Sequence, residues 1–372
     1  MLKTFVKKLD YWYNINYTED SRKQYGFLSV EENFCRYGIH TEGDEDVLSV
    51  LKKGDTIGVF SPSRPITAEA PEAVKKAVRF LEKNGYYVKM GRLTGRSDWY
   101  RSGSVEERAD ELNELIHDDS VTCLIASMGG YVSGSLLPYI DYTYFRKHPK
   151  LIVGHSDVTA LLLGIYAQTN ITTLYGANLV TAFGRCEEYA AECLHWLEKA
   201  GSRESFVYSM PPFYSDEAVD WEILPRHEKK LANAWKVISK GKASGRLIGG
   251  NLNTLVTLFG SPYMPKIREG DILFFENVGE YADACERYMY QLKNCGVLDK
   301  ISGLIIGKHR GYKDMGTGRS ETDICLEIMG ERRIPILSEF DCGHMSPVLT
   351  LPIGRIAQLD TSVPSAPALQ II

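Results

Sequence analysis

The segment "LIVGHSDVTALLLGIY", residues 151–166, places a hydroxyl between a strand and a helix that are both apolar. The turn carries Gly154, His155, Ser156 and Asp157 in succession. A serine on a sharp strand-to-helix turn is exposed, and the N–H groups of the following helix can stabilise an oxyanion. The same serine could instead cap the helix, with Asp157 complementing the helix dipole. The pattern is G-x-S-D rather than G-x-S-x-G, so these residues alone leave both interpretations open.

A glycine pair, Gly129 and Gly130, ends the segment "VTCLIASMGG". Glycines at the end of a strand allow close backbone approach and leave N–H groups available to an anion. A plain tight turn is the alternative. A phosphate loop would need G-x-x-x-x-G-K-[ST] or G-x-G-x-x-G, and neither pattern occurs in the sequence.

A carboxylate and a histidine follow two further strands. The apolar segment "DILFFE" ends on Glu276, with Glu280 nearby as a competing acid, and His344 lies in the Gly/Pro-rich loop "DCGHMSPVLTLPIG". Histidine is the usual general base near neutral pH. A solvated acid and a surface histidine are the alternatives. His309, after "GLIIGK", is the second candidate base; we do not expect His155 in that role, because neighbouring residues on a turn usually point apart.

Strands and helices alternate from Asp55 onward, which predicts parallel sheets covered on both faces. The apolar spacing predicts, for example, a helix from about residue 69 to 84 and a helix that starts at Asp157. Ligands bind beyond the carboxyl ends of such strands, so the turns that follow them are expected to gather at one edge. Residues 1–50 are expected to form an N-terminal extension, which we interpret as an arm that contacts a partner. The expected domains are residues 51–185 and 246–372, joined by a linker with a few strands at 186–245.

Composition narrows the function classes. The 372 residues carry a net charge of −5, and the basic residues are not clustered, which argues against nucleic acid or an anionic membrane as partner. No apolar run reaches the roughly 18 residues that a membrane span needs, and the N-terminus lacks a signal-peptide core. The eight cysteines form no C-x-x-C pair, which favours reduced thiols in the cytoplasm. Metal-ligand spacings such as H-E-x-x-H do not occur, so no metal is expected.

Taken together, the motifs resemble the LD-carboxypeptidase family of serine peptidases, which includes the muramoyl-tetrapeptide carboxypeptidases and the microcin C immunity peptidases. The resemblance extends from about Asp55 to Pro352. It rests on the joint order of "GDTIGVFSPS", "MGGY" with "LLPYIDY", "IVGHSDVTALL", "YGANLVTAFG", "GRLIGGNLNTL", "ILFFENVGE", "GLIIGK" and "CGHMSPVLTLPIG". Each piece is weak by itself, whereas their order and spacing are specific.

The resemblance implies an α/β fold, with a flavodoxin-like parallel-sheet domain followed by a smaller α/β C-terminal domain. It implies a Ser-Glu-His triad of Ser156, Glu276 and His344, which suits the chemistry because a serine needs an adjacent base and that base needs an orienting group.

The resemblance also implies an oxyanion hole made by the backbone N–H groups of Gly130 and Asp157. The substrate would be a murein peptide or a peptidyl-nucleotide, cleaved through an acyl-enzyme without a cofactor, by a homodimer. Trp221 and Trp235 could stack on a nucleobase; packing within the linker is the alternative for both. The alternative function is that of a catalytically silent or divergent family member, which binds such a ligand without turnover.

Overall fold

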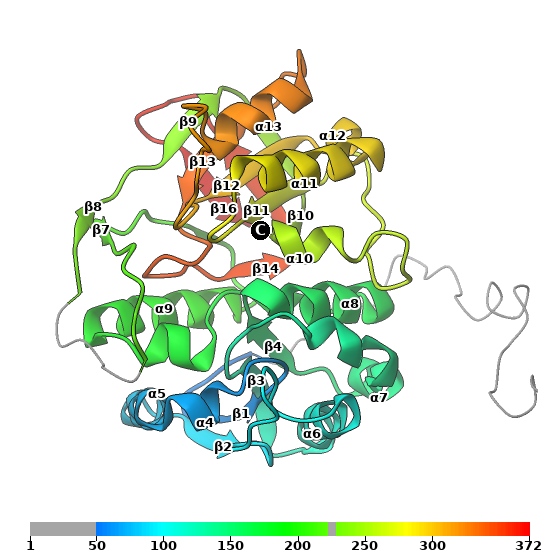
Figure 1. The fold of residues 1–372 in the computed structure, drawn as a ribbon, viewed down its shortest axis with the longest axis vertical. Coiled ribbons are helices and arrows are strands. Elements are labelled where there is room, and N and C mark those ends of the chain that lie inside the picture. Colours follow the sequence, from blue (N-terminus) through cyan, green and yellow to red (C-terminus); the bar gives the residue numbers. More distant parts are fainter. Residues whose placement is uncertain (1–49, 222–227) are drawn as a thin grey trace, which may run out of the picture. The chain divides into compact units, whose positions relative to one another are not determined.

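Two large sheets carry the alternating strands and helices (Figure 1). The computed structural model describes residues 50–221 and 228–372. Nearly all of the expected N-terminal extension, and residues 222–227 of the expected linker, therefore lie outside the described part of the chain.

The first sheet has the strand order β14-β5-β4-β3-β1-β2. The five strands from β2 to β5 are mutually parallel, which is the flavodoxin-like order, and β14 joins β5 antiparallel. The strands are β1 (Thr56–Phe60), β2 (Tyr87–Met90), β3 (Val121–Ala126), β4 (Leu151–Gly154), β5 (Thr173–Tyr175) and β14 (Leu351–Ile353). The expected flavodoxin-like domain is confirmed, with one strand added from the far end of the chain.

The helices around this sheet fall into two groups that contact one another within each group. One group contains α5 (Pro71–Lys83), the π-helical turn η3 (Leu179–Phe183) and α9 (Glu187–Ala200), with the short α4 (Ile66–Glu69) leading into α5. The other contains α6 (Val105–His117), the 3₁₀ turn η1 (Ser133–Tyr139), α7 (Tyr142–Lys147) and α8 (Thr159–Thr169). Strand β4 is buried along its whole length, as expected for a parallel strand covered on both faces.

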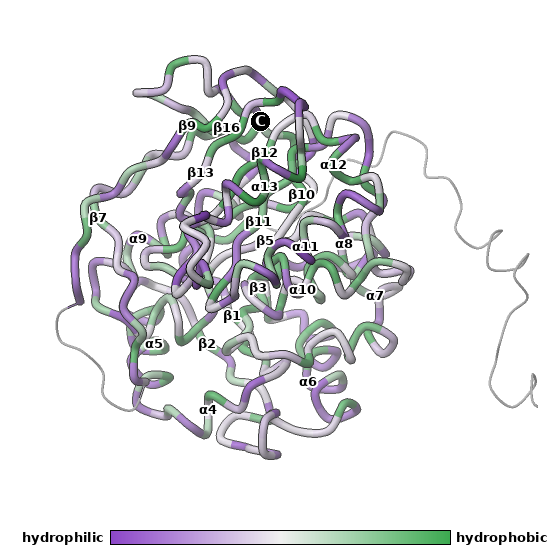
Figure 2. Tube along the Cα trace, turned by 45° about the horizontal axis from the view of Figure 1, so that its top comes forward, coloured by the Kyte–Doolittle hydropathy of each residue, from purple (hydrophilic) through white to green (hydrophobic). Residues whose placement is uncertain are grey.

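The second sheet has the strand order β6-β16-β15-β10-β11-β12-β13-β9. Its centre, from β10 to β13, is parallel, and its outer strands are antiparallel. The strands are β6 (Phe206–Val207), β9 (Lys236–Ser239), β10 (Lys242–Asn251), β11 (Ile272–Glu276), β12 (Gly303–Gly307), β13 (Ile336–Phe340), β15 (Ile356–Asp360) and β16 (Ala368–Ile371). Strands β11 and β12 are largely apolar (Figure 2), and every residue in both is buried. Their side chains belong to one hydrophobic core that also includes the strands of the first sheet.

Four helices accompany the second sheet: α10 (Leu252–Val256), α11 (Ala282–Asn294), α12 (Val297–Lys300) and α13 (Glu321–Met329). A small separate ribbon pairs β7 (Phe213–Tyr214) with β8 (Leu231–Ala232). Helix α13 begins with a capping box, in which Ser320 and Asp323 bond reciprocally to each other's backbone N–H groups.

Helix α8 joins the two halves of the molecule. Its sequence "TALLLGIYAQT" is apolar on nearly all sides, and a helix of that kind must be covered all round. It packs on β5 of the first sheet and also contacts β10 and α10 of the second (Figure 1). At the closest approach, a Cβ on Gly250 would lie 2.5 Å from Cγ2 of Thr159, so only glycine lets β10 reach this helix.

Two sequence-based expectations need correction. The α-helix after β4 begins at Thr159 rather than Asp157, because residues Ser156–Val158 form a 3₁₀ turn, η2. Residues 187–200, expected to be part of a linker with a few strands, form α9. One face of α9 is apolar and buried, and the linker interpretation overlooked that helical spacing.

Candidate active site

Ser156 occupies the strained turn between β4 and α8. Its φ angle is +63°, in the left-handed region that residues with a side chain rarely adopt. The preceding strand ends at Gly154, and the helix that follows is anchored by its buried apolar surface. The turn therefore holds Ser156 at the carboxyl edge of the first sheet, where it lines a cavity.

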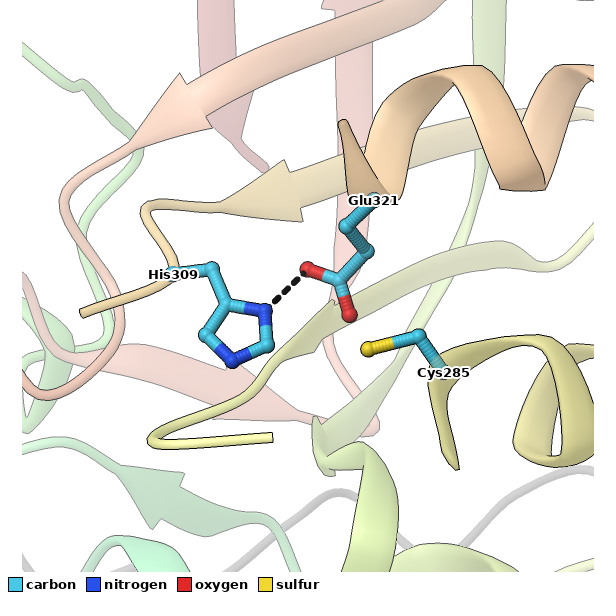
Figure 3. A group of neighbouring side chains, drawn as sticks. All are labelled: Cys285, His309 and Glu321. Carbon is cyan, nitrogen blue, oxygen red and sulfur yellow. Dashed lines mark hydrogen bonds and ion pairs between the residues drawn. The ribbon is translucent and has the colours of Figure 1, made fainter. Parts of the chain in front are cut away.

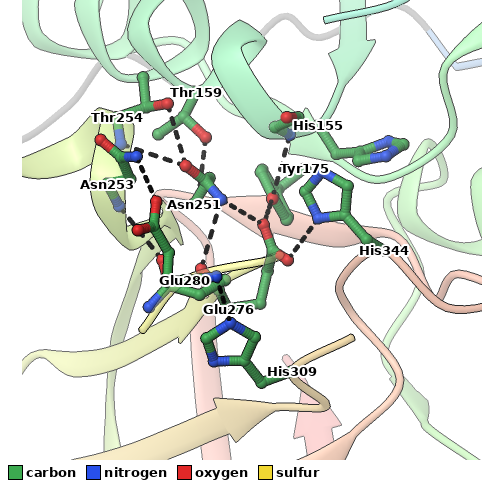
Figure 4. A network of polar contacts seen from close by, with 12 residues as sticks. His155, Thr159, Tyr175, Asn251, Asn253, Thr254, Glu276, Glu280, His309 and His344 are labelled. Atoms are coloured by element: carbon green, nitrogen blue, oxygen red, sulfur yellow. Dashed lines mark hydrogen bonds and ion pairs between the residues drawn. The ribbon is translucent and has the colours of Figure 1, made fainter. Parts of the chain in front are cut away.

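Glu276 is the last residue of β11 and has no exposed surface. Its carboxylate accepts hydrogen bonds from Tyr175 (Oη to Oε1, 2.6 Å) and from Asn251 (Nδ2 to Oε1, 2.9 Å), and Oε2 lies 2.7 Å from Nδ1 of His344 (Figure 4). Burial alone would raise the pKa of Glu276, but the charge of His344 and these hydrogen bonds lower it to about 2. The buried acid is therefore an anion that three donors satisfy.

The bond to Glu276 selects the tautomer of His344. A carboxylate can only accept, so Nδ1 of His344 carries the proton and Nε2 of the neutral ring is left as a base. The side chain of His344 retains 13% exposure, while that of Glu276 retains none. The ring of His155 packs edge-on against His344, with ring centroids 5.1 Å apart, and helps to fix its orientation.

His155 is held as a neutral side chain. Its Nδ1–H donates to the carbonyl oxygen of Gly176 over 2.8 Å. Burial, followed by the like charge of His344, lowers the pKa of His155 to about 4. A base for Ser156 must take up a proton near neutral pH, so His155 is poorly suited to that role, in line with the expectation from the sequence.

The glycine pair packs directly on the serine turn. A Cβ on Gly129 would lie 3.0 Å from Cβ of Ser156 and 3.2 Å from the backbone N of Asp157. A Cβ on Gly130 would lie 2.3 Å from Oγ of Ser63, which accepts the N–H groups of Tyr131 and Val132. Within residues 50–221 and 228–372, the N–H groups of Gly130 and Asp157 make no hydrogen bond of their own.

The side chain of Asp157 points away from the serine and braces the neighbouring loop. Its Oδ2 accepts the N–H of Ser133 over 2.9 Å, and the hydroxyl of Ser133 donates to the carbonyl oxygen of Asp157 over 2.6 Å. Burial raises the pKa of Asp157 despite these bonds. The side chain thus ties η2 to η1, which leaves the backbone N–H as the group of Asp157 that is available at the turn.

A cavity of about 550 Å³ opens on this edge of the first sheet. Gly129, Gly130, His155, Ser156 and His344 all line it, together with Trp221. Glu276 lies behind His344 and outside the lining. The structure therefore brings four of the predicted site residues, Gly130, Ser156, Trp221 and His344, to one cavity, and it places Glu276 in contact with that cavity's histidine.

The two tryptophans differ in their position relative to the cavity. Trp221 lines the cavity, whereas Trp235 does not. The indole N–H of Trp235 donates to Asp341 over 2.7 Å, and its ring packs 4.7 Å from that of Phe340. These contacts of Trp235 agree with the packing alternative that the sequence left open.

The second candidate base lies outside this cavity. His309 and Glu321 are hydrogen-bonded, Nδ1 to Oε2, over 3.0 Å, and Nε2 of His309 accepts the N–H of Glu280 over 3.3 Å. Glu280, the competing acid, accepts a 2.6 Å hydrogen bond from Asn253 and does not line the cavity. These placements remove His309 and Glu280 from the catalytic roles considered for them.

Cys285, His309 and Glu321 form the one group of potential metal ligands among the described residues (Figure 3). Their ligand atoms all lie within 4.8 Å of one another. The carboxylate of Glu321 is engaged by His309, by the amide of Asn277 and by the thiol of Cys285, whose pKa is raised by burial and by Glu321. The three side chains thus satisfy one another by hydrogen bonding.

The sequence did not point to two residues that complete the network. Tyr175 ends β5 and Asn251 ends β10, and both donate to Glu276. The hydroxyl of Tyr175 also accepts the N–H of Ser156 over 3.2 Å. Their one signal is position, since each is a polar group at the carboxyl end of a strand, as Glu276 is.

Comparison with known proteins agrees with this arrangement. Residues 57–176 match the LD-carboxypeptidase N-terminal domain, and residues 244–359 match the LD-carboxypeptidase C-terminal domain. The chain belongs to the LD-carboxypeptidase family. It is therefore a carboxypeptidase-type hydrolase, as the resemblance of its motifs implied.

Two relatives and one solved structure illustrate the similarity. A Vibrio cholerae protein with a provisional carboxypeptidase name is 45% identical over 83% of this chain and 93% of its own length. The microcin C7 self-immunity protein MccF of Escherichia coli is 41% identical over 83% of this chain and 92% of its own. The structure of MccF in complex with glutamyl sulfamoyl guanosine has a TM-score of 0.84 and 38% identity, covering 88% of this chain and 98% of the other.

No helix within residues 50–221 and 228–372 is both long enough and apolar enough to cross a membrane.

Proposed function

We propose that this LD-carboxypeptidase family member is a serine hydrolase in which Ser156 is the nucleophile, His344 the general base and Glu276 the orienting acid. The observation that carries the proposal is the hydrogen bond between Nδ1 of His344 and Glu276, beside a strained serine that lines the same cavity as the histidine. A serine hydroxyl becomes nucleophilic when an adjacent base removes its proton, and an anionic third group stabilises the imidazolium that results.

In the proposed cycle, Oγ of Ser156 attacks the carbonyl carbon of an amide or related acyl group while Nε2 of His344 accepts the hydroxyl proton. His344 then gives this proton to the leaving nitrogen, and an acyl-enzyme remains. A water molecule, deprotonated by the same Nε2, attacks the acyl-enzyme and regenerates Ser156. Glu276 stays ionised throughout, which its low pKa supports.

The oxyanion of the tetrahedral intermediate is proposed to bind the N–H groups of Gly130 and Asp157. Both N–H groups are without a partner in the described residues. Hydrogen bonds hold both turns in place, because Ser63 accepts the N–H of Val132 and Asp157 accepts the N–H of Ser133. Donors fixed before the reaction cost no reorganisation when the charge develops.

The proposed substrate is a small peptidyl-nucleotide, with a murein peptide as the alternative. Trp221 supports the nucleotide, because an indole in the cavity lining could stack on a base. The similarity to MccF, which binds glutamyl sulfamoyl guanosine, supports the same substrate class. The family name supports the murein peptide.

The test combines covalent labelling with product analysis. A fluorophosphonate probe should modify Ser156 in the wild-type chain and leave Ser156→Ala unmodified, as read by peptide mass spectrometry. Mass spectrometry of products after incubation with an L,D-tetrapeptide and with an aminoacyl sulfamoyl adenosine should show cleavage of one of them. Unchanged turnover by Ser156→Ala would overturn the proposal, and tight binding without labelling would favour the non-catalytic alternative.

The setting in which the enzyme works is also a proposal. The seven cysteines in the described residues are free thiols, which supports a reducing compartment such as the cytoplasm. We propose a homodimer on the resemblance to the family. Light scattering coupled to size-exclusion chromatography measures the mass directly, and a value near the 41.8 kDa of one chain would contradict the dimer.

A further inference from the structure

Three arginines line the catalytic cavity, and their charges are not balanced alike. Arg64 pairs with Glu69, Nε to Oε2, over 2.6 Å. Arg185 pairs with Glu228, and both of these side chains are almost completely buried. In the described part of the chain, the guanidinium of Arg310 forms neither an ion pair nor a hydrogen bond, although Glu69 and Asp220 also line the cavity.

The backbone of Arg310 is fixed, while its guanidinium makes no direct ion pair or hydrogen bond with residues 50–221 or 228–372. Its carbonyl oxygen accepts the N–H of Gly279 over 2.8 Å, and Arg310 forms a parallel bridge with Val278, two residues after Glu276. This bridge ties the segment after β12 to the segment that carries the orienting acid. The backbone position from which the Arg310 side chain extends is therefore fixed beside the proposed triad.

The charge of Arg310 reaches the catalytic residues. It interacts electrostatically with the carboxylates of Glu276 and Asp216 and with His155, and it lines the same cavity as Ser156 and His344. Burial and the like charge of Arg185 lower the pKa of Arg310, and these two carboxylates oppose that effect. A partly desolvated guanidinium without a direct ion pair is unfavourable, and a bound anion would relieve that cost.

Arg310 also stands between two cavities. It and Met345 line both the catalytic cavity and a neighbouring cavity of about 270 Å³. A ligand that enters the catalytic cavity would therefore meet the guanidinium where the two cavities adjoin.

We propose that Arg310 is a specificity-determining residue that binds an anionic group on the leaving side of the scissile bond. This inference rests on the proposed function, since it places the anion relative to the bond that Ser156 attacks. A terminal carboxylate and a sulfamoyl or phosphoryl linker both put negative charge at that place. A planar guanidinium can bind either through two parallel hydrogen bonds, which the ammonium group of lysine cannot reproduce.

The test compares charged and uncharged ligands. An L,D-tetrapeptide with a free carboxylate is paired with its carboxamide, and an aminoacyl sulfamoyl adenosine is paired with an analogue that lacks the sulfamoyl group. In the wild-type chain, kcat/KM for the charged member should exceed that of its uncharged partner by about 100-fold. In Arg310→Met this preference should disappear, and in Arg310→Lys it should return only in part.

Three controls separate this role from a loss of structure. Arg310→Met should retain the melting temperature of the wild type to within a few degrees. It should also still react with the fluorophosphonate at Ser156, because that probe carries no anionic group. Arg79→Met, an exposed arginine on α5, should keep the wild-type preference.

Binding keeps the inference testable even if turnover is not detected. Calorimetry with Ser156→Ala and with Ser156→Ala/Arg310→Met gives the affinity for each ligand pair without cleavage. Loss of the preference in the double variant supports the inference, and the pair that shows it identifies carboxylate or sulfamoyl as the anion. A preference that persists in Arg310→Met, in rate or in affinity, overturns it. Failure of labelling at Ser156 would instead overturn the proposed function.

Discussion

The phenolic hydroxyl of Tyr175 lies 2.6 Å from Oε1 of Glu276, so the last residue of β5 in one sheet is bonded to the last residue of β11 in the other. The same hydroxyl accepts the N–H of Ser156. Tyr175 thus connects the turn that carries the serine with the acid that holds His344. Neither connection is visible in the order of the residues along the chain.

Removing this hydroxyl should destabilise the protein in a pH-dependent way. Tyr175→Phe should lower the free energy of unfolding at pH 7 by about 1–3 kcal/mol, since a buried carboxylate loses a donor. The pKa of Glu276 is lowered from 4.5 to about 2 in the fold, so its contribution is complete above pH 4.5 and is lost as the pH falls toward 2. Urea unfolding should therefore show the deficit shrinking across that window, and a deficit equal at pH 7 and pH 3 would contradict it.

The positive φ angle of Ser156 predicts that two substitutions there abolish turnover alike but differ in their effect on stability. Ser156→Gly and Ser156→Ala should both lose turnover, but glycine relieves the cost of a positive φ while alanine retains it. We expect the glycine variant to be more stable than the alanine variant by about 1 kcal/mol in urea unfolding. Equal stabilities would indicate that the turn is not strained in solution.

His155 should make the fold sensitive to mild acid. Its pKa falls from 6.5 to about 4 on folding, so the unfolded chain binds the proton first as the pH is lowered. The stability associated with the neutral ring is complete above pH 6.5 and is lost between pH 6.5 and 4, by on the order of 3 kcal/mol. His155→Asn should lose less stability than the wild type across this interval, and parallel curves for the two proteins would refute the assignment.

Gly130 should not tolerate a side chain. In Gly130→Ala the new Cβ meets Oγ of Ser63 and the backbone N of Arg64, so the loop must move and its N–H is displaced. We expect kcat to fall by about 10²- to 10³-fold, as for the loss of one oxyanion donor. Gly134→Ala is the matched control on η1, because its Cβ finds only an ordinary contact at 3.5 Å with Ala160. Similar kcat values for the two variants would argue against the proposed oxyanion hole.

The two tryptophans predict opposite consequences. Trp221→Ala should raise KM for an aminoacyl sulfamoyl adenosine by about 5- to 100-fold, because base stacking is lost, and should change KM for a tetrapeptide much less. Trp235→Phe should leave both KM values unchanged and lower the melting temperature, because the hydrogen bond to Asp341 is lost. A KM for the nucleotide that does not respond to Trp221→Ala would favour the peptide as substrate.

Local sequence patterns sufficed for the buried strands and for the sheet edge at which the candidate residues lie, whereas the roles proposed for those residues came from the resemblance to the family. The apolar runs of β4 and β11 identified buried strands, and the polar residues that follow or end them, Ser156 and Glu276, fell at the edge where ligands bind. What could not be predicted involved partners distant in sequence. The bond from Tyr175 to Glu276 spans 101 residues, and nothing about a tyrosine at the end of a strand announces its acceptor. Helix α9 was overlooked because its charged face matched the polar character of the segment that follows.

The position of strand β14 in the sequence determines when the first sheet can be completed during synthesis. It supplies the sixth strand of the first sheet and pairs Leu351 with Tyr175, yet it is synthesised after the other five strands of that sheet. Until it emerges, β5 has an open edge beside the tyrosine that donates to Glu276. Contacts this distant in sequence form late because closing the intervening chain is entropically costly. A nascent chain that stops before β14 therefore has an incomplete first sheet, and one that stops before residue 344 also lacks the proposed base.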